Sequence, residues 1–200
     1  MITSQQQTTT GFRNEGTYHY RLLAMPDGEM AEKLRGEKRD FQREYNQGKT
    51  GPETPAVMIT EFIARDEMEE TIIRWLQRIT GEQKSFGITL NNFSGCPDHT
   101  VFLRIQDHSP FHELAVQLLP IDEYVQSYNC PPVRFARQPH LPIAENLPGS
   151  LYQAAIGDYS RRDFHGSFEV RELMLVRMGG GDSQEDRRAV LRLQPGAEVN

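Results

Sequence analysis

The order of hydrophobic and polar residues predicts a chain of alternating strands and helices. Apolar residues at every second position, bounded by turn residues, indicate strands, and apolar residues three or four positions apart indicate amphipathic helices. Strands are predicted over residues 18–24, 56–63, 86–93, 100–106, 139–144 and 168–176. Helices are predicted over residues 29–46, 67–80, 111–126 and 147–160.

Three local signals add detail to these elements. The turn residues of segment 94–98 join two strands as a β-hairpin. Pro120 must break or kink the third helix, because proline lacks the backbone N–H that a helix interior requires. In the last strand the apolar residues are even-numbered up to Val170 and odd-numbered from Leu173, which predicts a β-bulge near residues 171–172.

The order of these elements predicts an α+β fold with two lobes. A β-α-β arrangement occurs twice, with a hairpin between the two copies, so we expect helices outside and antiparallel sheets facing a central cleft. Residues 1–16 are polar and lack periodicity, which predicts a disordered N-terminal arm. The folded domain is expected over residues 17–178, and residues 179–200 form either a C-terminal tail or an edge strand.

The charge balance bears on the class of partner. Lys and Arg number 22 against 28 Asp and Glu, which gives a formal net charge of −6. Surfaces that coat nucleic acids are usually basic, so the sequence predicts no extended nucleic-acid surface. A small local phosphate site is compatible with this charge.

The cysteines and the N-terminus argue against other classes of protein. Cys96 and Cys130 have neither CxxC spacing nor a Cys/His cluster around them, so neither a disulfide framework nor a metal site is predicted. The N-terminus lacks the regions of a secretory signal, and no apolar run is long enough to span a bilayer. We therefore expect a cytoplasmic protein with no membrane partner. The pattern gives no prediction of oligomeric state.

Two of the predicted strands carry a related sequence motif. Residues 139–147 read Pro-His-Leu-Pro-Ile-Ala-Glu-Asn-Leu, and residues 55–62 read Pro-Ala-Val-Met-Ile-Thr-Glu-Phe. Side chains alternate along a strand, so His140 and Pro142 share one face. Paired strands with His-x-Thr or His-x-Ser motifs characterise the 2H phosphoesterase superfamily, which includes 2′-5′ RNA ligase-like proteins and cyclic nucleotide phosphodiesterases. This chain resembles that family from about residue 18 to residue 177.

The resemblance implies a chemistry and a set of site residues. In that family two motif histidines act as general base and general acid on a 2′,3′-cyclic or 2′-5′ phosphodiester, and the hydroxyl residues hold phosphate oxygens; no metal or other cofactor is needed. Here methionine stands at the first histidine position, Met58, before Thr60. His140 keeps the second histidine, but Pro142 replaces its hydroxyl residue. Methionine cannot transfer protons, and proline has neither a hydroxyl nor an N–H.

The resemblance therefore implies a candidate site at His140 and Thr60 that acts on or binds a small nucleotide or an RNA end, with reduced or lost catalysis. Three alternatives stay open. The chain is a diverged hydrolase in which His19 or a tyrosine assists His140, a catalytically inactive nucleotide- or ligand-binding regulatory module, or a protein-interaction domain. Elsewhere, His99 falls in the hairpin, His108 and His112 flank a helix start without forming a metal pair, and His165 lies in a turn.

Overall fold

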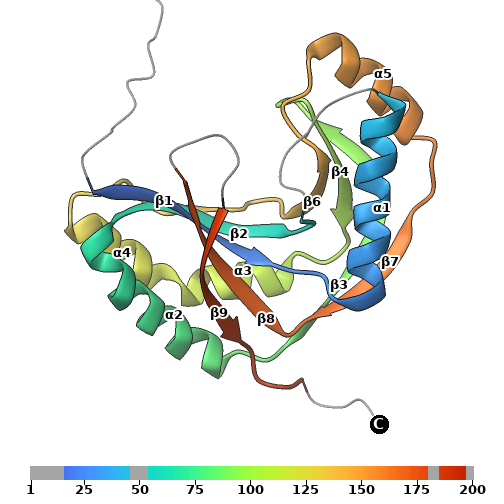
Figure 1. The fold of residues 1–200 in the computed structure, drawn as a ribbon. Helices are drawn as coiled ribbons and strands as arrows, with labels where there is room; N and C mark the ends of the chain where they lie inside the picture. Colours follow the sequence, from blue (N-terminus) through green and yellow to red (C-terminus); the bar gives the residue numbers. More distant parts are fainter. Residues whose placement is uncertain (1–15, 46–53, 180–184, 197–200) are drawn as a thin grey trace, which may run out of the picture.

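The computed structural model describes residues 16–45, 54–179 and 185–196. Residues 1–15, most of the predicted N-terminal arm, lie outside this range. Across the described residues, nine strands form two antiparallel sheets (Figure 1). The five-stranded sheet consists, in spatial order, of β5 (Arg134–Phe135), β2 (Val57–Arg65), β1 (Thr17–Ala24), β8 (Glu172–Met178) and β9 (Glu185–Arg192). The four-stranded sheet consists of β6 (His140–Ala144), β4 (Thr100–Ile105), β3 (Phe86–Cys96) and β7 (His165–Val170).

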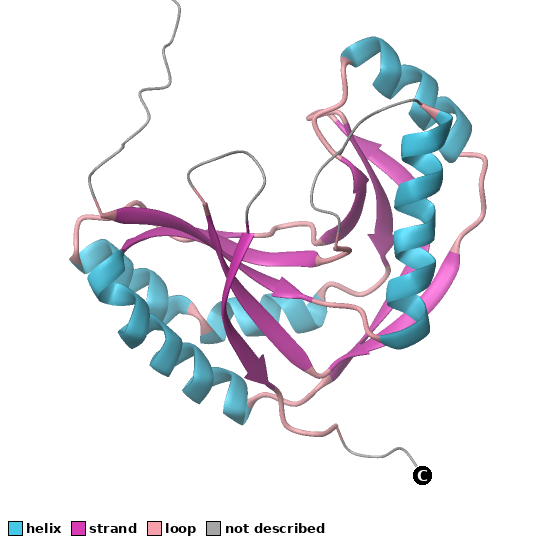
Figure 2. Ribbon diagram, in the orientation of Figure 1, coloured by secondary structure: helices cyan, strands magenta, loops and turns pink. Residues whose placement is uncertain are grey.

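The two strands that carry the motif sequences belong to different sheets. β2 lies in the five-stranded sheet and β6 lies at an edge of the four-stranded sheet. The two sheets incline towards each other, so β2 and β6 come close together (Figure 2). The prediction of a two-lobed α+β fold with antiparallel sheets is confirmed.

Helices cover the outer side of each sheet. α2 (Glu69–Glu82), preceded by the short 3-10 helix Asp66–Met68, lies along the five-stranded sheet together with α3 (Ser109–Gln117) and α4 (Leu119–Ser127) (Figure 1). α1 (Gly28–Glu44) and α5 (Gly149–Tyr159) contact strands of the four-stranded sheet. α1 thus follows a strand of one sheet and packs on the other. In the repeated β-α-β order, a helix therefore need not pack on the sheet that contains the strands before and after it.

The helix predicted over residues 111–126 is interrupted as expected. α3 ends at Gln117 and α4 begins at Leu119, with Pro120 in the first turn of the second helix. Proline is tolerated in a first turn because the N–H groups there have no partner inside the helix.

The strand predicted over residues 168–176 is two strands in different sheets. β7 pairs with β3 up to Val170, and β8 pairs with β1 from Leu173. The predicted bulge near residues 171–172 is therefore wrong. The apolar positions change phase because the chain passes from one sheet to the other at Arg171, and Val170 and Leu173 are both fully buried.

Two further strands complete the five-stranded sheet. β5 has only two residues and pairs with β2 at one edge, within a segment that the pattern predicts as a loop. β9 lies in the segment 179–200, for which the pattern leaves a tail and an edge strand open. It pairs with β8 at the other edge of the sheet.

An ion-pair network ties α2 to this sheet. Glu69, at the start of α2, accepts a 2.8 Å hydrogen bond from the hydroxyl of Tyr20 in β1 and another of 2.8 Å from Nε of Arg188 in β9. Nη1 of Arg177 in β8 lies 3.3 Å from the same carboxylate. Burial alone would raise the pKa of Glu69, but the hydrogen bonds from Arg188 and Tyr20 outweigh burial and hold the pKa below its ordinary value. One carboxylate thus joins a helix to three strands.

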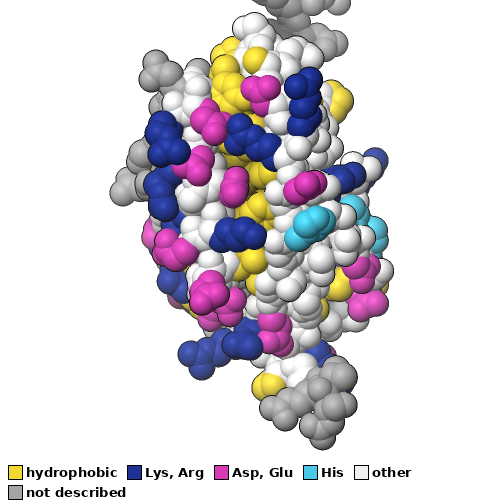
Figure 3. All heavy atoms as spheres, turned by 90° about the vertical axis from the view of Figure 1, so that its right-hand side faces the viewer, with side chains coloured by type: hydrophobic (Ala, Val, Ile, Leu, Met, Phe, Trp, Pro, Cys, Tyr) yellow, Lys and Arg dark blue, Asp and Glu magenta, His cyan; other side chains and the backbone are white. Residues whose placement is uncertain are grey.

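The outer surface shows mixed charges on the side that carries α1. Lys and Arg side chains alternate with Asp and Glu side chains there and do not form one basic area (Figure 3). Within the part of the chain that the structure describes, no helix combines the length and the hydropathy that crossing a membrane requires.

Candidate functional site

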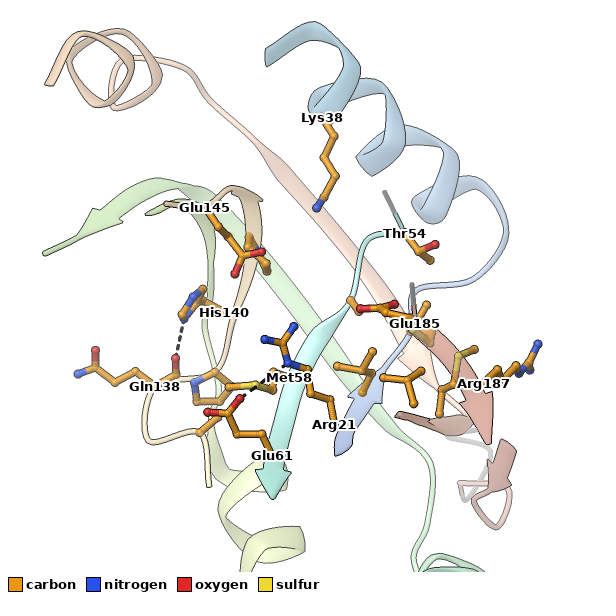
Figure 4. Close-up of a pocket in the computed structure, with 18 of the residues that line it drawn as sticks. Arg21, Lys38, Thr54, Met58, Glu61, Gln138, His140, Glu145, Glu185 and Arg187 are labelled. Carbon is orange, nitrogen blue, oxygen red and sulfur yellow. Dashed lines mark hydrogen bonds and ion pairs between the residues drawn. The ribbon is translucent and has the colours of Figure 1, made fainter. Parts of the chain in front are cut away.

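A cavity of about 650 Å³ lies where β2 of one sheet approaches β6 of the other (Figure 4). This volume falls in the range of pockets that hold small ligands. Met58 of β2 and His140 of β6 both line the cavity. Methionines and aliphatic side chains supply its apolar wall, and charged side chains of both signs supply the rest. The two motif strands therefore meet at one ligand-sized space.

His140 offers one nitrogen for proton exchange. Its Nδ1 lies 2.9 Å from the carbonyl oxygen of Gln138, and a carbonyl only accepts hydrogen bonds, so Nδ1 carries the hydrogen in this contact. Nε2 is then the nitrogen that gains or loses a proton. The ring packs against Phe102 of β4, with 4.4 Å between the ring centroids. The carbonyl and the aromatic ring together fix the orientation of this imidazole.

A β-bulge in β2 separates the two residues of the first motif. Met58 and Thr60 lie opposite consecutive residues of β1, so Ile59 is an extra residue in β2. A bulge of this kind breaks the alternation of side chains along a strand. Met58 and Glu61 accordingly line the cavity, whereas Thr60 is buried and is not among the lining residues.

The hydroxyl of Thr60 has a partner inside the protein. Its Oγ1 donates a 2.9 Å hydrogen bond to the carbonyl oxygen of Arg134 in β5. The bulge turns the side chain of Thr60 towards β5, outside the lining of this cavity. The contact holds the short edge strand against β2.

Pro142, at the second motif, does line the cavity. β6 is an edge strand that pairs only with β4, and edge positions tolerate proline because its nitrogen needs no ladder hydrogen bond there. Proline gives the cavity neither a hydroxyl nor an N–H donor at this position, and the sheet accommodates it.

A Thr60→Val variant tests the structural role of this hydroxyl. We expect it to lose about 1 kcal/mol of unfolding free energy, the typical value of one hydrogen bond, and to keep wild-type affinity for nucleotides. Urea unfolding and titration calorimetry measure the two quantities. A tenfold loss of nucleotide affinity at unchanged stability would show instead that the hydroxyl reaches the ligand.

Glu61 lies in the cavity wall at the position after Thr60 and contacts one histidine and two arginine side chains. Its carboxylate lies 3.1 Å from Nε2 of His19, 2.9 Å from Nη1 of Arg134 and 3.8 Å from Nε of Arg21. The hydrogen bond from His19 is the main reason that the pKa of Glu61 lies below its ordinary value, although burial opposes it. His19 thus sits beside the cavity, bonded to a lining residue, but does not line it.

Lys38 also lines the cavity, and the sequence interpretation did not include it. It enters from α1, outside both motif strands (Figure 4). The pattern held a signal for this residue: position 38 follows Leu34 by four residues, in the apolar stripe of the helix, where a lysine is unexpected.

The remaining histidines lie elsewhere. His165 is the first residue of β7, paired with Asn91 of β3, so its predicted place in a turn is wrong. The ring of His99 stacks on Tyr152, and its Nδ1 lies 3.0 Å from the carbonyl oxygen of Leu147. The rings of His108 and His112 lie 6.2 Å apart at the start of α3. Among the described residues, no group of three or more His, Cys, Asp or Glu side chains is arranged to hold a metal ion.

Comparison with known proteins places the chain in a family. Residues 34–182 match the 2′-5′ RNA ligase superfamily. The search of curated proteins found no match. The fold is similar to that of TT0787 of Thermus thermophilus, with a TM-score of 0.69 and 14% identity over 88% of this chain and 98% of that one.

Structures of E. coli LigT are similar as well. The complex with 3′-AMP gives a TM-score of 0.65 and 13% identity over 88% of this chain and 98% of LigT. The complex with ATP gives a TM-score of 0.60 and 13% identity over 90% of this chain and 99% of LigT. The motif strands in opposite sheets, the cavity between them and the family match lead to one conclusion: this chain belongs to the 2′-5′ RNA ligase superfamily and has the LigT-like 2H phosphoesterase fold.

Proposed function

We propose that this chain binds the phosphodiester of a nucleotide or an RNA end in the cavity between β2 and β6, with much weaker acid–base catalysis than a two-histidine phosphodiesterase. The observation that carries the proposal is the meeting of Met58 and His140, from different sheets, at one cavity. The two motif strands thus meet at one cavity, but they supply only one imidazole to it, that of His140. Family membership and the binding of 3′-AMP and ATP by the similar LigT support a nucleotide ligand.

The weak catalysis follows from the two positions that correspond to the motif histidines. Cleavage of a phosphodiester without a metal needs one group to remove a proton and another to supply one. His140 can fill one of these roles, but the thioether of Met58 can fill neither. His19, one candidate substitute for the missing histidine, is bonded to Glu61 and is not among the residues that line the cavity.

Binding should depend on the protonation of His140. Protonated imidazole donates a charge-assisted hydrogen bond to a phosphate oxygen, whereas neutral imidazole binds an anion poorly. We expect wild-type protein to bind 2′,3′-cyclic AMP roughly tenfold more tightly at pH 5.5 than at pH 8. Titration calorimetry checks this difference. The cyclic phosphodiester is a suitable probe because its charge stays at −1 across this pH range.

The control variants separate His140 from histidines outside the cavity. His140→Ala should abolish the pH dependence, and His108→Ala, on the surface at the start of α3, should retain it. Equal affinity at both pH values in wild type and in His140→Ala would remove this cavity from consideration as the nucleotide site. Incubation with 2′,3′-cyclic nucleotides and 2′-5′-linked dinucleotides, without added metal, measures the residual catalysis.

A further inference from the structure

Lys38 occupies a place in α1 that a hydrophobic side chain would normally fill. The buried residues of this helix are Ala31, Leu34, Lys38 and Phe41, which form the stripe that packs inward. Lys38 is only 5% exposed, and its side chain points into the cavity (Figure 4). Burial of an ammonium group costs free energy unless charged or polar groups compensate it. A lysine at this position is therefore disfavoured by packing alone.

The carboxylates that face Lys38 offset this cost only in part. Burial lowers the pKa of the Lys38 ammonium, while Glu145, next to β6, and Glu185, at the start of β9, act in the opposite direction. The net shift is downward, so the protonated amine is less stable here than in water. An additional anion in the cavity would stabilise the charged form.

A second cationic group approaches the same space from another element. Arg21 enters the cavity from β1, and its guanidinium is directed into the space below Lys38 (Figure 4). Its Nε has no hydrogen-bond partner among the described residues and lies 3.8 Å from the carboxylate of Glu61, as an ion pair. The guanidinium also carries terminal N–H donors, which would hydrogen-bond the oxygen of a ligand in this space.

We propose that Lys38 and Arg21 hold the phosphate group of the ligand, and that Lys38 of α1 supplies the positive charge that Met58, at the first histidine position of the motif, cannot carry. The inference rests on the proposed function and adds the residues that bind the anion. His140, Lys38 and Arg21 approach the cavity from three elements, β6, α1 and β1, which is the convergent arrangement that recognises an anion. The ligand class is a phosphomonoester or phosphodiester.

Titration calorimetry with three probes at pH 7 tests the role of Lys38. The probes are 3′-AMP, inorganic phosphate and adenosine. Lys38→Met, which keeps the length of the side chain and removes its charge, should weaken binding of 3′-AMP and phosphate about 10- to 100-fold and leave adenosine binding unchanged. Lys38→Arg should retain most of the phosphate affinity. Arg39→Met, the same loss of charge at the exposed neighbouring position, should bind like wild type.

Thermal unfolding distinguishes a ligand-binding lysine from a structural one. Lys38→Met should unfold at or above the wild-type temperature, because it removes a buried amine from an apolar stripe. A large fall in unfolding temperature with unchanged 3′-AMP affinity would overturn the inference. If Lys38→Met does not fold, Lys38→Gln provides the same comparison.

The outcomes separate the two proposals. Loss of 3′-AMP binding in His140→Ala but not in Lys38→Met or Lys38→Gln overturns the role of Lys38 and leaves the proposed function intact. Absence of 3′-AMP and phosphate binding in wild type overturns both.

Discussion

The Met58→His variant is expected to hydrolyse 2′,3′-cyclic AMP at least about 100-fold faster than wild type. General acid–base catalysis by a positioned imidazole contributes roughly 10²- to 10⁴-fold to a rate. Met58 lines the cavity from β2 and His140 lines it from β6, so a histidine at position 58 would restore a proton-transferring group on each side. Product formation by chromatography, without added metal, measures the gain.

A second methionine of the same cavity provides the control. Met174 of β8 lines the cavity but lies outside both motif strands, so Met174→His should add an imidazole without a comparable gain in rate. Addition of Pro142→Thr to Met58→His should raise the rate further, because Pro142 also faces the cavity and threonine restores a phosphate donor. Brisk hydrolysis by wild type that Met58→His does not change would mean that another residue performs the proton transfer.

Glu69→Gln is expected to lose about 2 kcal/mol of unfolding free energy at pH 7. The change leaves the guanidinium groups of Arg177 and Arg188 without their shared carboxylate. Breaking fully buried pairs costs about 3–5 kcal/mol, and the smaller value here reflects the 20% and 29% exposure of the two arginine side chains. For a protein of this size the loss corresponds to a decrease of roughly 4–8 °C in unfolding temperature, measurable by calorimetry. Glu67→Gln, at an exposed pair with Arg65, should change stability by less than about 0.5 kcal/mol.

The carboxylate of Glu69 also makes the free energy of unfolding decrease at acidic pH. The pKa of Glu69 is lower in the folded protein than its ordinary value of 4.5. A lowered folded-state pKa contributes stability above the unfolded-state pKa, and this contribution disappears as the pH falls through the folded-state value. Wild type should therefore lose more stability than Glu69→Gln below about pH 4.5. Parallel pH profiles for the two proteins would contradict the assigned role.

The sequence predicts the elements of this fold more reliably than their assignment to sheets. Hydrophobic periodicity is a local property, so it locates α1, α2 and the β3–β4 hairpin within a few residues. It cannot show that residues on either side of Arg171 belong to different sheets, because a sheet change and a bulge produce the same shift of phase. β5 has only two residues, which is too short for any periodicity.

The residues of the candidate site are likewise only partly predictable from the sequence. The resemblance locates Met58, His140 and Pro142, all of which line the cavity. It does not show which way the side chain of Thr60 points, since a single extra residue in β2 sets that direction and no local signal in the sequence marks the bulge. Lys38 is visible in the sequence as a charge within an apolar stripe, but only the packing of α1 against the strands of the other lobe gives it a place in the cavity.

Two very short chain segments connect strands of one sheet to strands of the other. A single residue, Arg171, separates β7 from β8, and residues 136–139 separate β5 from β6. Links this short cannot lengthen, and Ala136, Gln138 and Pro139 of the second link themselves line the cavity. These two links tie the lobes together, one of them directly beside the cavity. A ligand of this cavity therefore contacts the link between the sheets itself, so binding and the relative position of the two sheets should be coupled.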